Sequence, residues 1–306
     1  MIPVLKRIKA GQPIYEYVKA HKNKVGTPTM GGLFLCLSVF VVFALFGGLK
    51  SRIATVSAVI GIAFMIVGFI DDFIKIHFKR NEGLKPYQKV FFQFFIAVFA
   101  GVFVWYNGIS DFNIPFFNKS VYLGVYSIPV VTIIFIAMTN SVNLTDGLDG
   151  LAGSVGVVYL VFFAVLIMLQ TDNFSKLYFS AAEYRGLLIL TFSLIGGLLA
   201  FLVFNFSKAI VFMGDTGSLS LGGFLGALGV FSGNGFFIPL LGITFVVSSI
   251  SVILQVIHYK RTHKRIFLMA PFHHHLELKG MSESKIAYLY SLITLFFGIF
   301  VILPYL

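Results

Sequence analysis

The sequence predicts an all-α, polytopic integral membrane protein folded as a helix bundle. Of its 306 residues, 58% are hydrophobic and 11% are charged, and the mean hydropathy is +0.93. Apolar stretches of about 20 residues recur along the chain, and such stretches cross a bilayer only as helices or closed barrels. Barrel strands alternate apolar and polar residues over about ten positions, and no alternation of that kind occurs here. We therefore expect one transmembrane domain spanning residues 1–306.

Nine apolar segments are expected to form the transmembrane helices. They span residues 30–48, 53–70, 90–106, 125–139, 151–169, 186–204, 217–232, 236–257 and 286–304. Nine crossings place successive loops on alternating sides, and most of the 23 Lys and Arg residues fall on one of these sides. By the positive-inside rule that side is cytoplasmic. We expect a multi-pass membrane protein whose functional groups face the cytoplasm.

The net charge of +11 does not indicate a nucleic-acid partner. In a membrane protein, such an excess reflects basic cytoplasmic loops that face anionic lipid. The single cysteine, Cys36, lies inside an apolar segment, so the chain has no disulfide framework. We expect this protein to be embedded in the lipid bilayer and not to bind nucleic acid.

The stretch 140–153 lies between two apolar segments and is rich in polar groups. Its side chains recur at every third position: Asn140, Asn143, Asp146 and Asp149. On a helical turn these side chains would share one face, and Gly147 would let a ligand approach it closely. Thr145 or Asp146 is placed to cap the next helix and leave N–H groups free for a phosphate. The alternative is a polar helix–loop junction with an ordinary cap.

Asp71 and Asp72 end the second apolar segment. Adjacent carboxylates repel unless a cation offsets them, and Lys75 lies within helical reach of both. An acidic pair beside a diphosphate is a common way to hold Mg²⁺. The alternative is a solvated helix end with one salt bridge.

Asp215 opens the seventh apolar segment between Gly214 and Gly217, with Thr216 and Ser218 placed to cap the helix. The alternative is that Asp215 itself is an ordinary N-cap. The triplet His273, His274 and His275 lies in the longest cytoplasmic loop.

Three consecutive histidines cannot share one helical face, so the triplet indicates a loop or a helix end. It suits phosphate contacts or proton relay better than zinc binding, because zinc sites use ligands that are spaced along the sequence. A solvated polar loop is the alternative.

Residues 22–32 combine cations, hydroxyls and a glycine pair before the first apolar segment, which fits a phosphate contact or plain flanking charge. All these stretches fall on the cytoplasmic side, so we expect one shared cleft.

Together these stretches resemble the bacterial phospho-N-acetylmuramoyl-pentapeptide transferase family, within the polyprenyl-phosphate N-acetylhexosamine-1-phosphate transferases. Five motifs in the same order carry the resemblance: Gly26 to Gly32, Asp71 to Lys75, Asn140 to Gly150, Met213 to Ser218 and Ala270 to His275. The histidine triplet after Ala-Pro favours this family over relatives that use UDP-GlcNAc. The resemblance covers essentially the whole chain.

The resemblance implies a Mg²⁺-dependent enzyme that transfers phospho-MurNAc-pentapeptide from UDP-MurNAc-pentapeptide to undecaprenyl phosphate. The products would be lipid I and UMP, in the first membrane step of peptidoglycan synthesis. Family members are expected to be homodimers with ten transmembrane helices, whereas this sequence shows nine clear ones and only a short segment before its first basic residues. A related UDP-GlcNAc:polyprenyl-phosphate transferase is the alternative activity, and an ion or metal transporter is the alternative class.

The resemblance also implies roles for individual residues. Catalytic roles fall to Asp71, Asp72, Asp215, His274 and His275, with Asp215 as the metal ligand. Substrate contacts fall to Lys24, Thr29, Lys75, Lys89, Asn140, Asn143, Asp146, Gly147, Leu148, Asp149, Asn205, Phe212, Gln255 and His273. Two mechanisms stay open: direct attack by the lipid phosphate, with Asp71 keeping the acceptor deprotonated, and a two-step route through a covalent aspartate intermediate.

Overall fold

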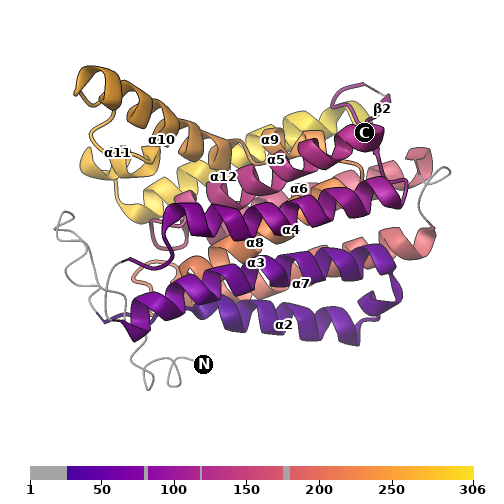
Figure 1. The fold of residues 1–306 in the computed structure, drawn as a ribbon, viewed down its shortest axis with the longest axis horizontal. Coiled ribbons are helices and arrows are strands. Elements are labelled where there is room, and N and C mark those ends of the chain that lie inside the picture. The colour runs from indigo at the N-terminus through magenta and orange to yellow at the C-terminus, as the bar shows by residue number, and fades with distance from the viewer. Residues whose placement is uncertain (1–25, 79–81, 118, 175–179) are drawn as a thin grey trace.

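The computed structural model describes residues 26–78, 82–117, 119–174 and 180–306, which form a bundle of long helices with one small hairpin (Figure 1). The helices are α2 (Gly31–Leu45), α3 (Arg52–His77), α4 (Pro86–Tyr106), α5 (Ser127–Thr145), α6 (Leu151–Phe174), α7 (Ala181–Asn205), α8 (Gly214–Phe231), α9 (Ile238–Leu241), α10 (Ile243–Thr262), α11 (Phe272–Leu278) and α12 (Glu283–Ile302). Strands β1 (Asp111–Asn113) and β2 (Ser120–Tyr122) pair antiparallel, with Phe112 opposite Val121. The hairpin lies at the end of the bundle opposite α11 (Figure 1).

The membrane fold expected from the sequence is confirmed. Among the described residues, seven helical stretches are long and apolar enough to cross a membrane: Arg52–His77, Pro86–Tyr106, Gly124–Thr145, Leu151–Gln170, Ala181–Asn205, Ile243–Thr262 and Glu283–Tyr305. The expected segments 30–48 and 217–232 form α2 and α8, which are not among these seven. The 15 residues of α2 extend only about 22 Å, less than the roughly 30 Å of a hydrocarbon core.

The outer surface of the bundle is apolar, as lipid contact requires. On α4, Phe91, Phe95 and Phe99 follow one another at helical spacing and are 56%, 56% and 62% exposed. Water would penalise such a surface, whereas hydrocarbon does not. The apolar faces of the helices therefore point outward to lipid as well as inward to the core.

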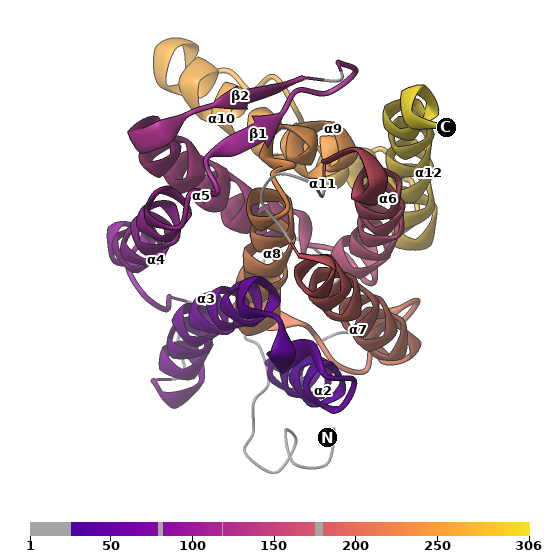
Figure 2. The ribbon, with the colours of Figure 1, turned by 90° about the vertical axis from the view of Figure 1, so that its right-hand side faces the viewer.

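Helix α8 lies at the centre of the ring of helices (Figure 2) and is buried from Thr216 to Phe231. Its first turn is wedged between α2 and α3. A Cβ atom at Gly68 of α3 would lie 2.1 Å from the carbonyl oxygen of Asp215, and one at Gly32 of α2 would lie 2.1 Å from the Cα of Gly217. Only glycine permits this approach, so these two positions fix where the side chains at the start of α8 lie.

The start of α3 is held by a carboxylate from α7. Ser51 is the N-cap, and its hydroxyl oxygen accepts a hydrogen bond from the N–H of Ala54. The same hydroxyl donates to Glu183, whose carboxylate also accepts from the N–H of Ile53 at 2.9 Å. A side chain on a neighbouring helix thus binds N–H groups that α3 leaves unpaired at its first turn.

Candidate active site

Three aspartates and two lysines meet at the end of the bundle that carries α11. Asp71 and Asp72 come from the last turns of α3, and Asp215 comes from the first turn of α8. In the described part of the chain they form the one group of three or more potential metal-ligating side chains in which one atom of each lies within 4.8 Å of the others. The expected proximity of Asp71, Asp72 and Asp215 is therefore confirmed.

Two ammonium groups lie between Asp71 and Asp215. Lys75 Nζ lies 2.6 Å from Asp71 Oδ2 and 2.9 Å from Asp215 Oδ2. Lys89, in the first turn of α4, places its Nζ 2.7 Å from Asp215 Oδ2 and 3.4 Å from Asp71 Oδ1. The two carboxylates are thus held beside each other by cations, in a buried place where like charges alone would repel.

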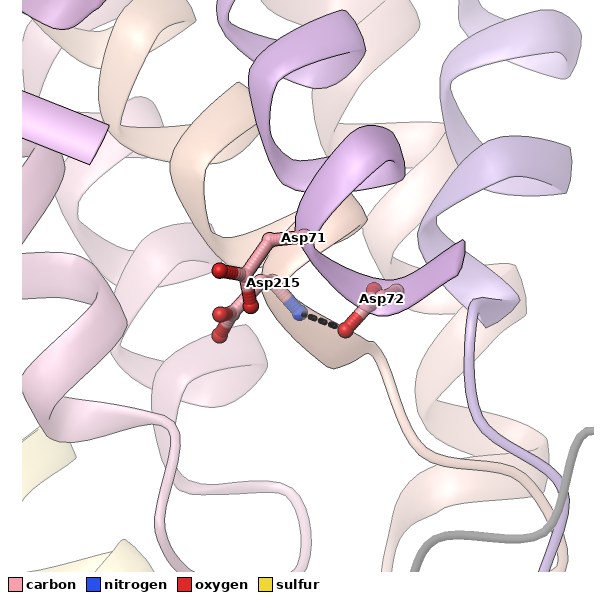
Figure 3. Close-up of side chains that lie close together, drawn as sticks. All are labelled: Asp71, Asp72 and Asp215. Atoms are coloured by element: carbon pink, nitrogen blue, oxygen red, sulfur yellow. Dashed lines mark hydrogen bonds between the residues drawn. The ribbon is translucent and has the colours of Figure 1, made fainter. Parts of the chain in front are cut away.

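Asp72 points the other way, toward the start of α8 (Figure 3). Its Oδ1 accepts the N–H of Asp215 at 3.2 Å, and its Oδ2 accepts the N–H and the hydroxyl of Thr216 at 2.8 and 2.6 Å. The expectation that Thr216 or Ser218 caps α8 is wrong. Ser218 donates to the Gly214 carbonyl and Thr216 donates to Asp72, so the cap comes from α3.

Asn143 binds the aspartate cluster directly. Its side-chain nitrogen donates to Asp215 Oδ1 at 2.7 Å and to the Ser218 hydroxyl at 2.8 Å. Asn140 behaves differently, because its nitrogen donates to Gln93 of α4 at 2.7 Å. The expected common face for the four polar side chains of the 140–153 stretch is therefore wrong: α5 ends at Thr145, so only these two asparagines lie on it.

The loop between α5 and α6 begins at Asp146, which is the C-cap of α5. Thr145 donates its hydroxyl to Ser141 within α5, so neither Thr145 nor Asp146 caps the next helix, contrary to expectation. Burial raises the pKa of the Asp146 carboxyl well above its usual range, and the nearby charges of Asp215 and Asp72 raise it further. Asp146 therefore lies close enough to Asp215 and Asp72 for their charges to affect its ionisation.

Asp149 and Asn205 fasten this loop to the connection between α7 and α8. Asp149 Oδ2 accepts the N–H of Ala209 at 2.9 Å. Asn205 accepts the N–H of Gly150 at 3.0 Å and donates to the Val211 carbonyl at 2.9 Å. Both side chains are buried, so in this structure they bind backbone groups of two loops.

Leu148 and Phe212 flank this junction. The Leu148 side chain is buried in the apolar core. Phe212 is tied through its backbone to the segment before α2: its N–H donates to the Pro28 carbonyl at 2.8 Å, and its carbonyl accepts from Gly31 at 2.9 Å. Thr29 of that segment is buried, and its hydroxyl has no hydrogen-bond partner within the described residues. Lys24 lies outside the described residues.

The histidine triplet occupies the first turn of α11, as the prediction of a helix end allowed. His273 and His274 face the loop after α5, where a Cβ atom at Gly147 would lie 2.7 Å from His273 Nε2 and 2.9 Å from His274 Nε2. His274 Nδ1 pairs with Glu277 Oε2 at 2.8 Å. Burial lowers the pKa of His273 to about 3, so His273 is neutral at physiological pH.

Gln255 and His275 hold the loop between α10 and α11. The Gln255 carbonyl oxygen accepts the N–H groups of Ile266 and Phe267, each at 3.0 Å, and its nitrogen donates back to Phe267. His275 Nδ1 accepts the N–H of Leu268 at 3.1 Å. In this structure both side chains bind loop backbone and neither contacts the aspartate cluster.

Several partners in this region were missed from the sequence. Glu277 follows His274 at helical spacing, so its pairing was predictable from the spacing alone. Gln93, which binds Asn140, and Glu283, which accepts the N–H of Asp149 at 2.8 Å, lie on other helices. No sequence signal connects them to the loop, because such pairs form only when the bundle packs.

Comparison with known proteins shows which family the chain belongs to. Residues 53–233 match the family described as Glycosyl transferase family 4. Phospho-N-acetylmuramoyl-pentapeptide-transferases from Caldanaerobacter subterraneus subsp. tengcongensis, Acetivibrio thermocellus and Halalkalibacterium halodurans are each 40% identical to this chain. The alignments cover 96%, 96% and 98% of it and 89%, 86% and 90% of the relatives. The chain is an enzyme that belongs to the phospho-N-acetylmuramoyl-pentapeptide-transferase family.

Proposed function

We propose that the enzyme transfers phospho-MurNAc-pentapeptide from UDP-MurNAc-pentapeptide to undecaprenyl phosphate, giving lipid I and UMP in a Mg²⁺-dependent reaction. The observation that carries the proposal is the pairing of Asp71 and Asp215 with Lys75 and Lys89 in a member of this family. Phosphoryl transfer between a diphosphate and a phosphate depends chiefly on positioning and charge neutralisation. Carboxylates for a metal and ammonium groups for phosphates supply both.

The residues present fit Mg²⁺. Mg²⁺ prefers hard oxygen ligands and is usually held by one or two carboxylates together with substrate phosphates. Asp72 has both oxygens engaged by α8. Asp215 Oδ2 and Asp71 Oδ2 are instead paired with lysine side chains that can turn away, although Asn143 binds Asp215 Oδ1 and the Leu84 N–H binds Asp71 Oδ1. Asp215 would hold the ion, with Asp71 beside it. When bound, Mg²⁺ supplies positive charge to the diphosphate.

The remaining groups are assigned by position. Lys75 and Lys89 would neutralise phosphate oxygens once they leave the carboxylates. Asp71 would keep the acceptor phosphate deprotonated for direct attack on the donor phosphorus; a covalent intermediate on an aspartate remains the competing route. Asn143 would hold Asp215 in place while it contacts substrate, and Gly147 and His274 would border the same cleft.

The cellular setting of the proposal follows from charge and lipid chemistry. The basic loops support a position of the cluster on the cytoplasmic face of the inner membrane, where a nucleotide sugar is available. The acceptor's prenyl chain would lie against the apolar outer surface of the bundle. We propose that residues 1–306 act as one catalytic domain and that the enzyme works as a homodimer.

Purified protein incubated with UDP-MurNAc-pentapeptide, undecaprenyl phosphate and Mg²⁺ should release UMP and form a lipid-linked product. Release should stop when Mg²⁺ is chelated and resume when it is restored. UDP-GlcNAc in place of the donor tests the related activity, and ion flux in liposomes tests the transporter class. No UMP from the first donor, with UMP from UDP-GlcNAc, would contradict the proposed substrate.

A further inference from the structure

Asp72 is a buried carboxylate whose two oxygens are both engaged by the first turn of α8. Three donors reach it: the N–H of Asp215, the N–H of Thr216 and the hydroxyl of Thr216. Asp72 is 3% exposed, so little solvent competes with these bonds. Among the described residues the nearest cation is Lys75, whose Nζ is 3.9 Å from Asp72 Oδ1, against 2.6 Å from Asp71 Oδ2. Asp71 and Asp72 are adjacent in sequence but lie in different surroundings.

The bonds to Asp72 occur at the first turn of α8, which has no side-chain cap from its own N-cap residue. The first N–H groups of any helix lack partners within the helix, and a carboxylate there is favoured by the helix dipole. Met213, the residue before α8, has no capping side chain. Asp72 on α3 supplies the cap from outside, as Glu183 on α7 does for α3.

The position of this cap matters because Asp215 is one of the residues it holds. Asp215 follows Gly214, whose φ is +71°, so the backbone turns sharply just before the carboxylate that faces the lysines. Asp72 binds the N–H of that same residue. A shift of the first turn of α8 against α3 would therefore move Asp215 relative to Asp71.

We infer that Asp72 is a positioning residue: it caps α8 from α3 and thereby fixes Asp215 opposite Asp71. It acts through Thr216 and the backbone of Asp215, not as a base or a metal ligand, because both of its oxygens bind the first turn of α8 and point away from the lysines, with Lys75 Nζ 3.9 Å from its Oδ1. This inference rests on the proposed function, in which Asp215 holds Mg²⁺. Groups that orient metal ligands commonly matter about 10- to 100-fold for affinity or activity.

Thr216 gives the discriminating experiment. Asp72→Asn, Thr216→Val and Thr216→Ser are compared with Glu183→Gln, which weakens a cap of the same kind at the far end of α3. Mn²⁺ binding to each purified protein is titrated by electron paramagnetic resonance, and transfer is measured against Mg²⁺ concentration. We expect Asp72→Asn and Thr216→Val each to weaken Mn²⁺ binding about tenfold or more and to need more Mg²⁺ for half-maximal transfer. Thr216→Ser, which keeps the hydroxyl, should stay near wild type, and Glu183→Gln should change melting temperature only.

A catalytic base or direct metal ligand at position 72 gives a different pattern. Asp72→Asn would then abolish transfer while Thr216→Val stayed normal, and that result would overturn the inference. If Thr216→Val does not fold, Thr216→Ala replaces it. The double variant Asp72→Asn/Thr216→Ala should then bind Mn²⁺ no more weakly than Asp72→Asn alone, because both substitutions act on the contact between Asp72 and Thr216. Additive losses of Mn²⁺ affinity would overturn the inference, as would wild-type protein that binds no Mn²⁺. Absence of transfer with the expected ranking of Mn²⁺ affinities would refute the proposed reaction and leave the positioning role standing.

Discussion

Lys89 Nζ lies 2.7 Å from Asp215 Oδ2, so a lysine from α4 binds the carboxylate that is proposed to hold Mg²⁺. An ammonium group and a divalent cation would compete for this oxygen, so a metal bound there would displace the lysine. Once displaced, the lysine is beside the place where the diphosphate would lie. The same side chain therefore balances charge in the substrate-free enzyme and is available for a phosphate in the complex.

Lys89→Met should bind Mn²⁺ more tightly than wild type when no substrate is present, while transfer falls. We expect about tenfold tighter binding, a modest share of the roughly 4 kcal/mol between unit charges about 4 Å apart at an effective dielectric of about 20. Mn²⁺ titration measures it. Lys85→Met, which changes an exposed lysine one turn earlier, is the control and should alter neither quantity. Weaker Mn²⁺ binding in Lys89→Met would show that Lys89 does not compete with the metal.

Asp215→Asn should abolish transfer, and added Mg²⁺ should not restore it, because the charge is lost along with a ligand oxygen. The helix itself should be unaffected, since Asp72 supplies the cap of α8. The UMP assay at increasing Mg²⁺ and the melting temperature of the variant measure the two effects. Substantial transfer at ordinary Mg²⁺ would place the metal elsewhere, with Asp71 as the remaining carboxylate.

Gly147→Ala should impair transfer strongly, because the added methyl would lie within 3 Å of the Nε2 atoms of both His273 and His274. Either the α5–α6 loop or α11 must move. Gly196→Ala is the matched control: nothing lies within 4 Å of its added methyl, and removing a glycine from a helix interior stabilises it by up to about 1 kcal/mol. Equal transfer by the two variants would show that contact between the loop and α11 is unimportant.

His273 should make the folded protein sensitive to acid. Burial lowers its pKa from 6.5 to about 3. Below about pH 6.5 the unfolded chain therefore binds a proton at His273 that the folded protein does not bind. Stability is unaffected above that range and falls as pH decreases toward 3, by up to about 1.4 kcal/mol per pH unit. Melting temperatures at pH 7.5 and 5.0 measure the fall, and His273→Leu should show a smaller one. An equal fall in both proteins would assign the acid sensitivity to other groups.

The sequence was a good guide to the proximity of Asp71, Asp72 and Asp215, because the positive-inside rule assigns loops to one face without knowledge of packing. Asp71 and Asp215 are 144 positions apart, and their predicted proximity is observed. The sequence was a poor guide to what each side chain does there. Whether Asp71 or Asp72 faces the lysines depends on the rotation of α3 against α8, which Gly68 sets by contact with the backbone of α8.

Gln255 and Asn140 illustrate the same limit. Each is a carboxamide in a motif that resembles a substrate site, and each has its hydrogen bonds directed elsewhere: Gln255 to the loop after α10 and Asn140 to Gln93. A carboxamide serves a backbone, another side chain or a ligand equally well. Only the packed structure decides which partner is in reach.

The central helix α8 is also packed tightly along its length. Thr139 packs against the middle of α8 at Gly222, and Ile238 packs near its end at Gly229; an added Cβ atom at either glycine would come within 2.5 Å of these residues. The hairpin binds the turn after α8, where the Asn113 N–H donates to the Gly233 carbonyl at 2.8 Å. A helix packed in this way transmits a displacement along its axis instead of absorbing it. From Gly229 to Asp215 is about 21 Å of helix, so a displacement of α8 at Gly229 would shift the Asp215 carboxylate at the other end. Changes at the hairpin end of the bundle therefore have a mechanical route to the aspartate cluster without touching it.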